Sequence, residues 1–156
     1  MGSTCIFEYM STPSFGCAGM PGGYSICVFK SGDVVQREYV FGDKEPKAEV
    51  ILATMPELAK TIQTIVSSHS DDLKFIPNNL DNGTLDGSYN CFKFGGKRIS
   101  AWTIQRTDLE EIHRRNPRYY EAYKENMIFE NLVLDIYDEI AAEINKHDVG
   151  VKMNIL

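Results

Sequence analysis

A basic and aromatic stretch near residue 116 has residue types that could bind a small anion. Residues 113–120 read His-Arg-Arg-Asn-Pro-Arg-Tyr-Tyr. Arginine offers a planar fork of donors to a phosphate, and tyrosine offers a surface on which a base can stack. Asn116 before Pro117 predicts a helix start, whose free backbone N–H groups also favour an anion. The alternative is local ion pairing with the acidic residues nearby, which are Asp108, Glu110, Glu111 and Glu121.

Two polar residues interrupt the apolar face of the helix predicted from Pro117. At about 100° per residue, Asn126 and Glu130 fall on that face and neighbour each other. A carboxylate pointed at a core needs a partner, so Glu130 either joins a structural hydrogen bond or faces a ligand pocket. The expected apolar residues of this face are Tyr119, Tyr123, Val133, Tyr137, Ile140 and Ile144. The candidate site for a small anionic ligand is Arg114, Arg115, Arg118, Tyr119, Tyr123, Asn126 and Glu130.

The outer face of the same helix is acidic around one apolar residue. Ile128 lies among carboxylates at helical spacing, so it could anchor a protein partner or mark a bend. An acidic surface suits a basic protein partner. The candidate partner-binding residues are Glu121, Ile128, Asp135, Asp138 and Glu139.

A thiol in a glycine-rich loop raises the question of covalent catalysis. Cys17 lies in residues 14–23, but a nucleophilic cysteine needs a base, usually histidine. His69 falls on an apolar helix face and is expected in the core. The four cysteines form no CxxC pair, and the loop at residues 78–87 lacks the EF-hand ligand order, although it holds Asp81, Asn82 and Asp86. We therefore expect no metal and no cofactor, and a cysteine-dependent enzyme remains an alternative.

Length and charge limit the class of protein. The chain has 156 residues, which fits a single domain spanning residues 1–156. Its net charge of −6 argues against binding to duplex nucleic acid. It contains no apolar run that could cross a membrane and no signal-peptide pattern at its start, so the expected location is the cytoplasm.

Strand patterns dominate the first two thirds of the chain. Residues 5–10 predict a strand, residues 24–30 and 34–41 predict a hairpin, and residues 89–94 and 97–104 predict a second hairpin around Gly95-Gly96. Residues 48–53 fit either a strand or a helical turn.

Helix signals follow each hairpin. Thr54 with Glu57 and Thr107 with Glu110 have capping-box spacing, which predicts helices that end at about residues 70–72 and at about Arg115. A third helix is expected from Asn116 to about His147, followed by an extended segment or strand at residues 149–155.

These elements predict an α+β fold. Its antiparallel sheet is built from two β-hairpins and packs against a middle helix and a long C-terminal helix. The first functional hypothesis is a small acidic protein that inhibits or neutralises a macromolecular partner, of the toxin-immunity or phage anti-defence type. The alternative is a small-ligand or nucleotide-binding protein that uses the Arg/Tyr segment.

Overall fold

The computed structural model describes residues 3–13, 16–80 and 88–156. Within these ranges seven strands form one sheet in the order β4-β3-β2-β1-β6-β7-β5. The strands are β1 (Cys5–Pro13), β2 (Pro21–Phe29), β3 (Asp33–Val40), β4 (Ala48–Thr54), β5 (Asn79–Leu80), β6 (Ser88–Phe94) and β7 (Lys97–Trp102). Neighbouring strands are antiparallel, except that β5 runs parallel to β7.

The sheet is larger than the one expected from the sequence. The two predicted hairpins correspond to β2–β3 and β6–β7. Strand β1 joins them, because Tyr9 pairs with Ile26 on one side and with Phe92 on the other. Residues 48–53, which fitted either a strand or a helix, belong to the edge strand β4.

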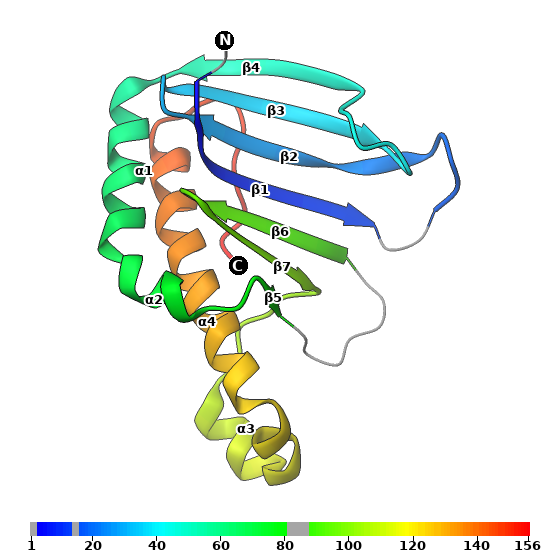
Figure 1. Ribbon diagram of the computed structural model, residues 1–156, viewed down its shortest axis with the longest axis vertical. Coiled ribbons are helices and arrows are strands. Elements are labelled where there is room, and N and C mark those ends of the chain that lie inside the picture. Colours follow the sequence, from blue (N-terminus) through cyan, green and yellow to red (C-terminus); the bar gives the residue numbers. More distant parts are fainter. Residues whose placement is uncertain (1–2, 14–15, 81–87) are drawn as a thin grey trace.

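Helices α1 (Pro56–Ser68) and α4 (Pro117–Lys146) contact each other and lie on the same side of the sheet (Figure 1). Helix α4 is continuous over 30 residues, which the sequence pattern alone did not decide. Helix α3 (Leu109–Arg115) packs on the start of α4, and together they project beyond the sheet (Figure 1). None of the helices in the described ranges is long and apolar enough to cross a membrane.

Three details at the helix ends correct the sequence analysis. The side chain of Thr54 does not cap α1, because its hydroxyl donates to Asp33 Oδ1 at 2.7 Å. The cap of α3 is Asp108 instead of Thr107, and its carboxylate accepts the Glu111 N–H at 3.1 Å. Residues 70–72 begin a separate helix, α2 (Ser70–Phe75), after the chain turns at His69.

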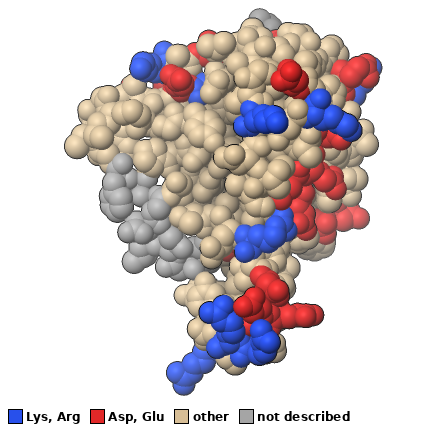
Figure 2. All heavy atoms as spheres, turned by 180° about the vertical axis from the view of Figure 1, so that it is seen from behind, with Lys and Arg blue, Asp and Glu red and all other residues tan. Residues whose placement is uncertain are grey.

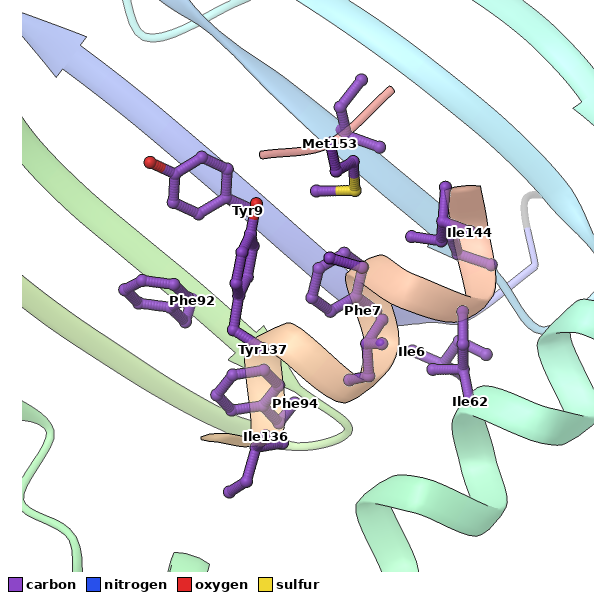
Figure 3. Packing of buried hydrophobic residues seen from close by; sticks show 14 of the residues in the cluster. Ile6, Phe7, Tyr9, Ile62, Phe92, Phe94, Ile136, Tyr137, Ile144 and Met153 are labelled. Carbon is purple, nitrogen blue, oxygen red and sulfur yellow. The ribbon is translucent and has the colours of Figure 1, made fainter. Parts of the chain in front are cut away.

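The core lies between the helices and the near face of the sheet (Figure 3). It is built on Phe7, Tyr9, Phe92 and Phe94 of the sheet and on Tyr137 of α4. The apolar face of α4 is wider and shorter than predicted, since Val133, Tyr137, Ile140 and Ile144 are buried as expected. Tyr119 and Tyr123 are half-buried on the projecting part, and the residues missed by the sequence are Met127, Leu134, Ile136 and Ala141.

The segment after α4 forms no strand, contrary to one of the two expectations for it. Residues 149–156, called the C-terminal tail below, return along the sheet on the side of the helices (Figure 1). Val149 and Met153 are buried in the core cluster and Val151 packs against it, whereas Ile155 is exposed.

Candidate functional site

A cavity of about 270 Å³ opens between the sheet, α4 and the C-terminal tail. We call it the tyrosine pocket, because Tyr9, Tyr24 and Tyr137 line it. The other lining residues are Ile26, Gln36, Val151, Lys152, Met153, Asn154 and Leu156.

Strand register places the residues of the pocket floor. Tyr9 on β1 is opposite Ile26 on β2, and Ile26 is opposite Gln36 on β3. Residues directly opposite each other point to the same face of a sheet, so these three form one row beneath α4. Tyr24, two residues before Ile26, adds a second ring to the floor at 6.3 Å from Tyr9.

Tyr9 is fixed by its hydroxyl group. That hydroxyl donates to Asn90 Oδ1 at 2.8 Å, and the Asn90 side chain in turn donates to the Ser88 carbonyl at 3.3 Å. The Tyr9 ring also packs against Phe92 at 5.2 Å between centroids. Burial, together with the nearby Tyr24, raises the pKa of Tyr9, so its hydroxyl stays protonated and keeps donating.

Tyr137 is 1% exposed, and its ring lies 5.0 Å from that of Tyr9 and 5.7 Å from that of Phe92. Its hydroxyl has no hydrogen-bond partner among residues 3–13, 16–80 and 88–156. No fully enclosed side-chain oxygen in these ranges lacks a partner, so the hydroxyl reaches the pocket rather than a closed interior. Figure 3 shows it pointing toward Tyr9 and Met153. Burial is the main reason that the pKa of Tyr137 is raised, which keeps this group a donor.

Two side chains of α4 hold the tail that closes the pocket. Asn145 accepts the Met153 N–H at 2.7 Å and donates to the Met153 carbonyl at 2.8 Å. Asp138 Oδ1 accepts the Leu156 N–H at 2.7 Å. The wall is therefore tied to the same helix that carries Tyr137.

The chemistry of the lining suits binding. Aromatic and aliphatic groups surround a few polar ones, as in typical small-molecule sites. The described lining residues include no carboxylate, histidine or thiol that could act as an acid, base or nucleophile. No cluster of three His, Cys, Asp or Glu residues in the described part of the chain could hold a metal ion.

The acidic residues predicted to bind a partner are largely engaged within the protein. Arg106 pairs with Asp135 and, at 2.9 Å, with Asp138. Glu139 lies 3.4 Å from His69, which is therefore a surface contact of α1 and α4 and not the core residue expected. Glu121 pairs with Lys124 at 3.1 Å. Ile128 is 42% exposed, as expected for the outer face.

Figure 2 shows how these charges are distributed on one face of the protein. Acidic side chains gather along one side of the body, and both signs of charge crowd the projecting part. Much of the rest of this face is uncharged.

The predicted Arg/Tyr site does not form one cavity. Arg114 and Arg115 line two separate, open depressions that also contain Asp108 and Glu111. Arg115 pairs with Glu111 at 3.4 Å, and Arg118 is exposed. The Tyr119 and Tyr123 rings pack on each other at 4.8 Å.

Asn126 and Glu130 lie together, as predicted, but they do not line a pocket. Glu130 is 3% exposed and accepts hydrogen bonds from Asn126 Nδ2 at 2.8 Å and from the Gln105 N–H at 3.2 Å. Cys17 is exposed. Asp81, Asn82 and Asp86 lie outside the described residues.

Sequence reasoning missed the tyrosine pocket because its residues come from three strands, one helix and the tail. Among the pocket residues, only Tyr137 could have been suspected from the sequence, because it places a hydroxyl on the predicted apolar face of α4.

Comparisons with protein-family models, with curated proteins and with solved structures found no match for this chain. The fold and the pocket geometry are therefore the basis of the functional argument.

Proposed function

We propose that this protein binds a small uncharged molecule, mostly apolar and bearing a hydrogen-bond acceptor, in the tyrosine pocket. The observation that carries the proposal is the Tyr137 hydroxyl, which is protonated, has no partner in the described residues and opens to the cavity. In this cavity the hydroxyl can bond to water, and a ligand acceptor that replaces the water would form a hydrogen bond worth about 0.5–1.5 kcal/mol net.

The size and polarity of the pocket limit the ligand. A cavity of about 150 Å³ holds benzene, so the 270 Å³ here suits one ring with a short substituent. Tyr9, Tyr24 and Tyr137 offer ring edges and faces, while the Gln36 amide can donate or accept. Lys152 is exposed, so its charge stays in water and does not offset the desolvation of a buried anion.

Three probes that share one ring test the ligand class. Acetophenone offers a carbonyl acceptor, ethylbenzene has a similar shape without it, and benzoate carries a charge. We expect acetophenone to bind most tightly in titrations followed by NMR. In Tyr137→Phe its affinity should fall about five- to tenfold, the value of one hydrogen bond, while ethylbenzene is unaffected.

The matched control is Tyr123→Phe, which removes a hydroxyl from the projecting part of α4 and should leave all three affinities unchanged. Failure of all three probes to saturate the protein would contradict the proposal. Equal affinities of wild type and Tyr137→Phe for acetophenone would contradict it as well.

A second candidate function is the binding and neutralising of a macromolecular partner, of the toxin-immunity or phage anti-defence type. The observation that favours it is the edge strand β4, where Val50 and Ile51 are 56% and 60% exposed. An unprotected edge can pair with an extended segment of another protein. Neutralisation of Asp135 and Asp138 by Arg106 makes the acidic face of α4 a weaker candidate for steering.

Matched lysine substitutions distinguish binding at the β4 edge from binding at the outer face of α4. If the edge binds a protein, Ile51→Lys should abolish co-purification of that protein from the source organism, while Ile128→Lys on α4 should retain it. The reverse result would assign binding to α4, and retention by both variants would contradict this candidate.

The proposed location is the cytoplasm. Cys5, Cys17, Cys27 and Cys91 are all free thiols, which suits a reducing compartment. Fractionation of cells expressing the tagged protein tests this assignment.

A further inference from the structure

A second cavity adjoins the tyrosine pocket at Tyr24. It has a volume of about 450 Å³, and Tyr24 lines it together with Glu38 and Val40 of β3 and Lys47, which precedes β4. We call it the outer cavity. Tyr24 also lines the tyrosine pocket, and no other described residue lines both cavities.

Strand register explains why the two cavities are neighbours. Tyr24 on β2 is opposite Glu38 on β3, whereas Ile26 is opposite Gln36. Because alternate residues of a strand point to the same face, Gln36 and Glu38 follow each other along the face that carries α4. Gln36 lines the tyrosine pocket and Glu38 lines the outer cavity, so the boundary between the cavities crosses this face at Tyr24.

The Tyr24 side chain is held by packing and not by a hydrogen bond. Its ring meets that of Tyr9 edge-on, at 6.3 Å between centroids and 70° between the ring planes. Its hydroxyl bonds to none of the residues that the structure describes. Since Tyr24 is 40% exposed, its ring can be replaced without leaving a closed hole in the core.

We propose that Tyr24 is the specificity-determining residue of the tyrosine pocket, because its ring divides the pocket from the outer cavity and so limits the length of the ligand. This inference rests on the small-molecule binding proposed above. With the ring in place, a ligand is confined to the cavity of about 270 Å³, which suits one ring with a short substituent. Without the ring, the two cavities join along β2 and β3.

The outer cavity limits the kind of substituent that it would accept. Val40 offers apolar surface to a chain that passes position 24. Glu38 and Lys47 are exposed, so their charges stay in water and leave the path of the chain uncharged. An alkyl chain therefore suits this path, and each methylene that it buries there tightens binding about three- to fourfold.

Two ketones of different length test the proposal. In wild-type protein, titrations followed by NMR should show 4-butylacetophenone binding no more tightly than acetophenone, because its chain meets the Tyr24 ring or stays in water. In Tyr24→Ala the butyl compound should bind at least about tenfold more tightly than acetophenone, because its chain gains apolar contact. The ratio of the two affinities within each variant cancels the loss of ring contacts that both ligands share.

Matched variants at the same position separate the ring from the hydroxyl. Tyr24→Phe keeps the ring and should retain the wild-type ratio, whereas Tyr24→Val, whose side chain suits a strand, should behave like Tyr24→Ala. The Val40 methyl signals locate the chain, and 4-butylacetophenone should shift them in Tyr24→Ala but not in wild type.

The outcomes distinguish this inference from the proposed function on which it rests. Binding of acetophenone with the same ratio in wild type, Tyr24→Ala and Tyr24→Val would overturn the role of Tyr24 and leave the pocket as a binding site. A gain in Tyr24→Phe equal to that in Tyr24→Ala would also overturn it. Failure of acetophenone to bind the wild-type protein would overturn both.

Discussion

Asn126 donates a hydrogen bond from Nδ2 to Glu130 Oε1 at 2.8 Å, one turn further along α4. The other carboxylate oxygen accepts the Gln105 N–H at 3.2 Å. The buried carboxylate therefore ties α4 to the segment that follows β7. This geometry favours the structural interpretation of the two residues over a role in ligand binding.

Replacement of Glu130 should mainly lower stability. In Glu130→Gln the side chain keeps a single oxygen, which cannot accept from both the Asn126 side chain and the Gln105 N–H. We therefore expect the free energy of unfolding to fall by about 1–3 kcal/mol. Urea denaturation followed by circular dichroism measures the change. Glu125→Gln, on the exposed side of α4, is the control and should change stability by less than about 0.5 kcal/mol. Unchanged stability of Glu130→Gln together with loss of acetophenone binding would reverse the assignment.

The hydroxyls of Tyr9 and Tyr137 should contribute differently to stability. Tyr9→Phe removes the donor to Asn90, so we expect a loss of about 1–2 kcal/mol. Tyr137→Phe removes a hydroxyl without a partner in the described residues, so stability should be unchanged or slightly higher. Thermal unfolding of the two variants without ligand compares them. Equal losses would mean that the Tyr137 hydroxyl is already bonded in the free protein.

Two substitutions at the start of α3 test whether Asp108 or Thr107 caps this helix. Asp108→Ala removes the side chain that accepts the Glu111 N–H and should destabilise the protein by about 0.5–2 kcal/mol. Thr107→Ala should have a smaller effect, because Asn131 bonds to the backbone N–H and carbonyl of Thr107, at 2.9 Å each. Denaturation curves of both variants provide the comparison, and a larger effect of Thr107→Ala would restore the original capping box.

The C-terminal tail depends on Asn145. Asn145→Ala removes both hydrogen bonds to Met153, so we expect faster hydrogen exchange over residues 149–156 and weaker binding of acetophenone. Exchange followed by mass spectrometry measures the first effect. Lys146→Ala, one position further along α4, is the control. Tail exchange equal to that of wild type would show that Val149 and Met153 hold the segment by packing alone.

Alkylation of Cys5 should depend on pH in a specific direction. Because its pKa is lowered to about 7, the thiolate fraction and the rate with iodoacetamide should rise through about pH 7 and level off above it. Cys27→Ala removes the main cause of the lowered pKa and should move the curve to higher pH, and Lys93→Gln should do so by less. Peptide mapping at each pH distinguishes Cys5 from the other thiols. A curve unaffected by Cys27→Ala would mean that the two sulfurs do not interact.

Local patterns predicted the elements well where one short segment decides the structure. The Gly95-Gly96 turn, the β2–β3 hairpin and the Asn116 cap with Pro117 each depend on a few adjacent residues, and each is present. The predicted helix caps at Thr54 and Thr107 are wrong because another side chain competes in each case. Asp33, on a neighbouring strand, takes the Thr54 hydroxyl, and Asp108 lies one residue nearer to α3.

The candidate sites differ in the same respect, namely whether they depend on local or on distant residues. Asn126 and Glu130 could be paired from the sequence, because a helix brings residues four apart together. The tyrosine pocket could not, because it depends on which strands are neighbours. The order of the sheet places β6 beside β1, and that pairing brings Phe92 next to Tyr9 and Lys93 next to Glu8.

The sequence by itself determined the α+β class, the long helix α4 and the pairing of Asn126 with Glu130 on it. Periodicity and turn chemistry act over a few residues and do not need the rest of the chain. Only the tertiary structure decided the strand order, the return of the tail over the sheet and the position of Tyr137 at a cavity. Those features arise from contacts between residues far apart in the sequence, whose burial favours one arrangement of the elements over the others that the same local patterns allow.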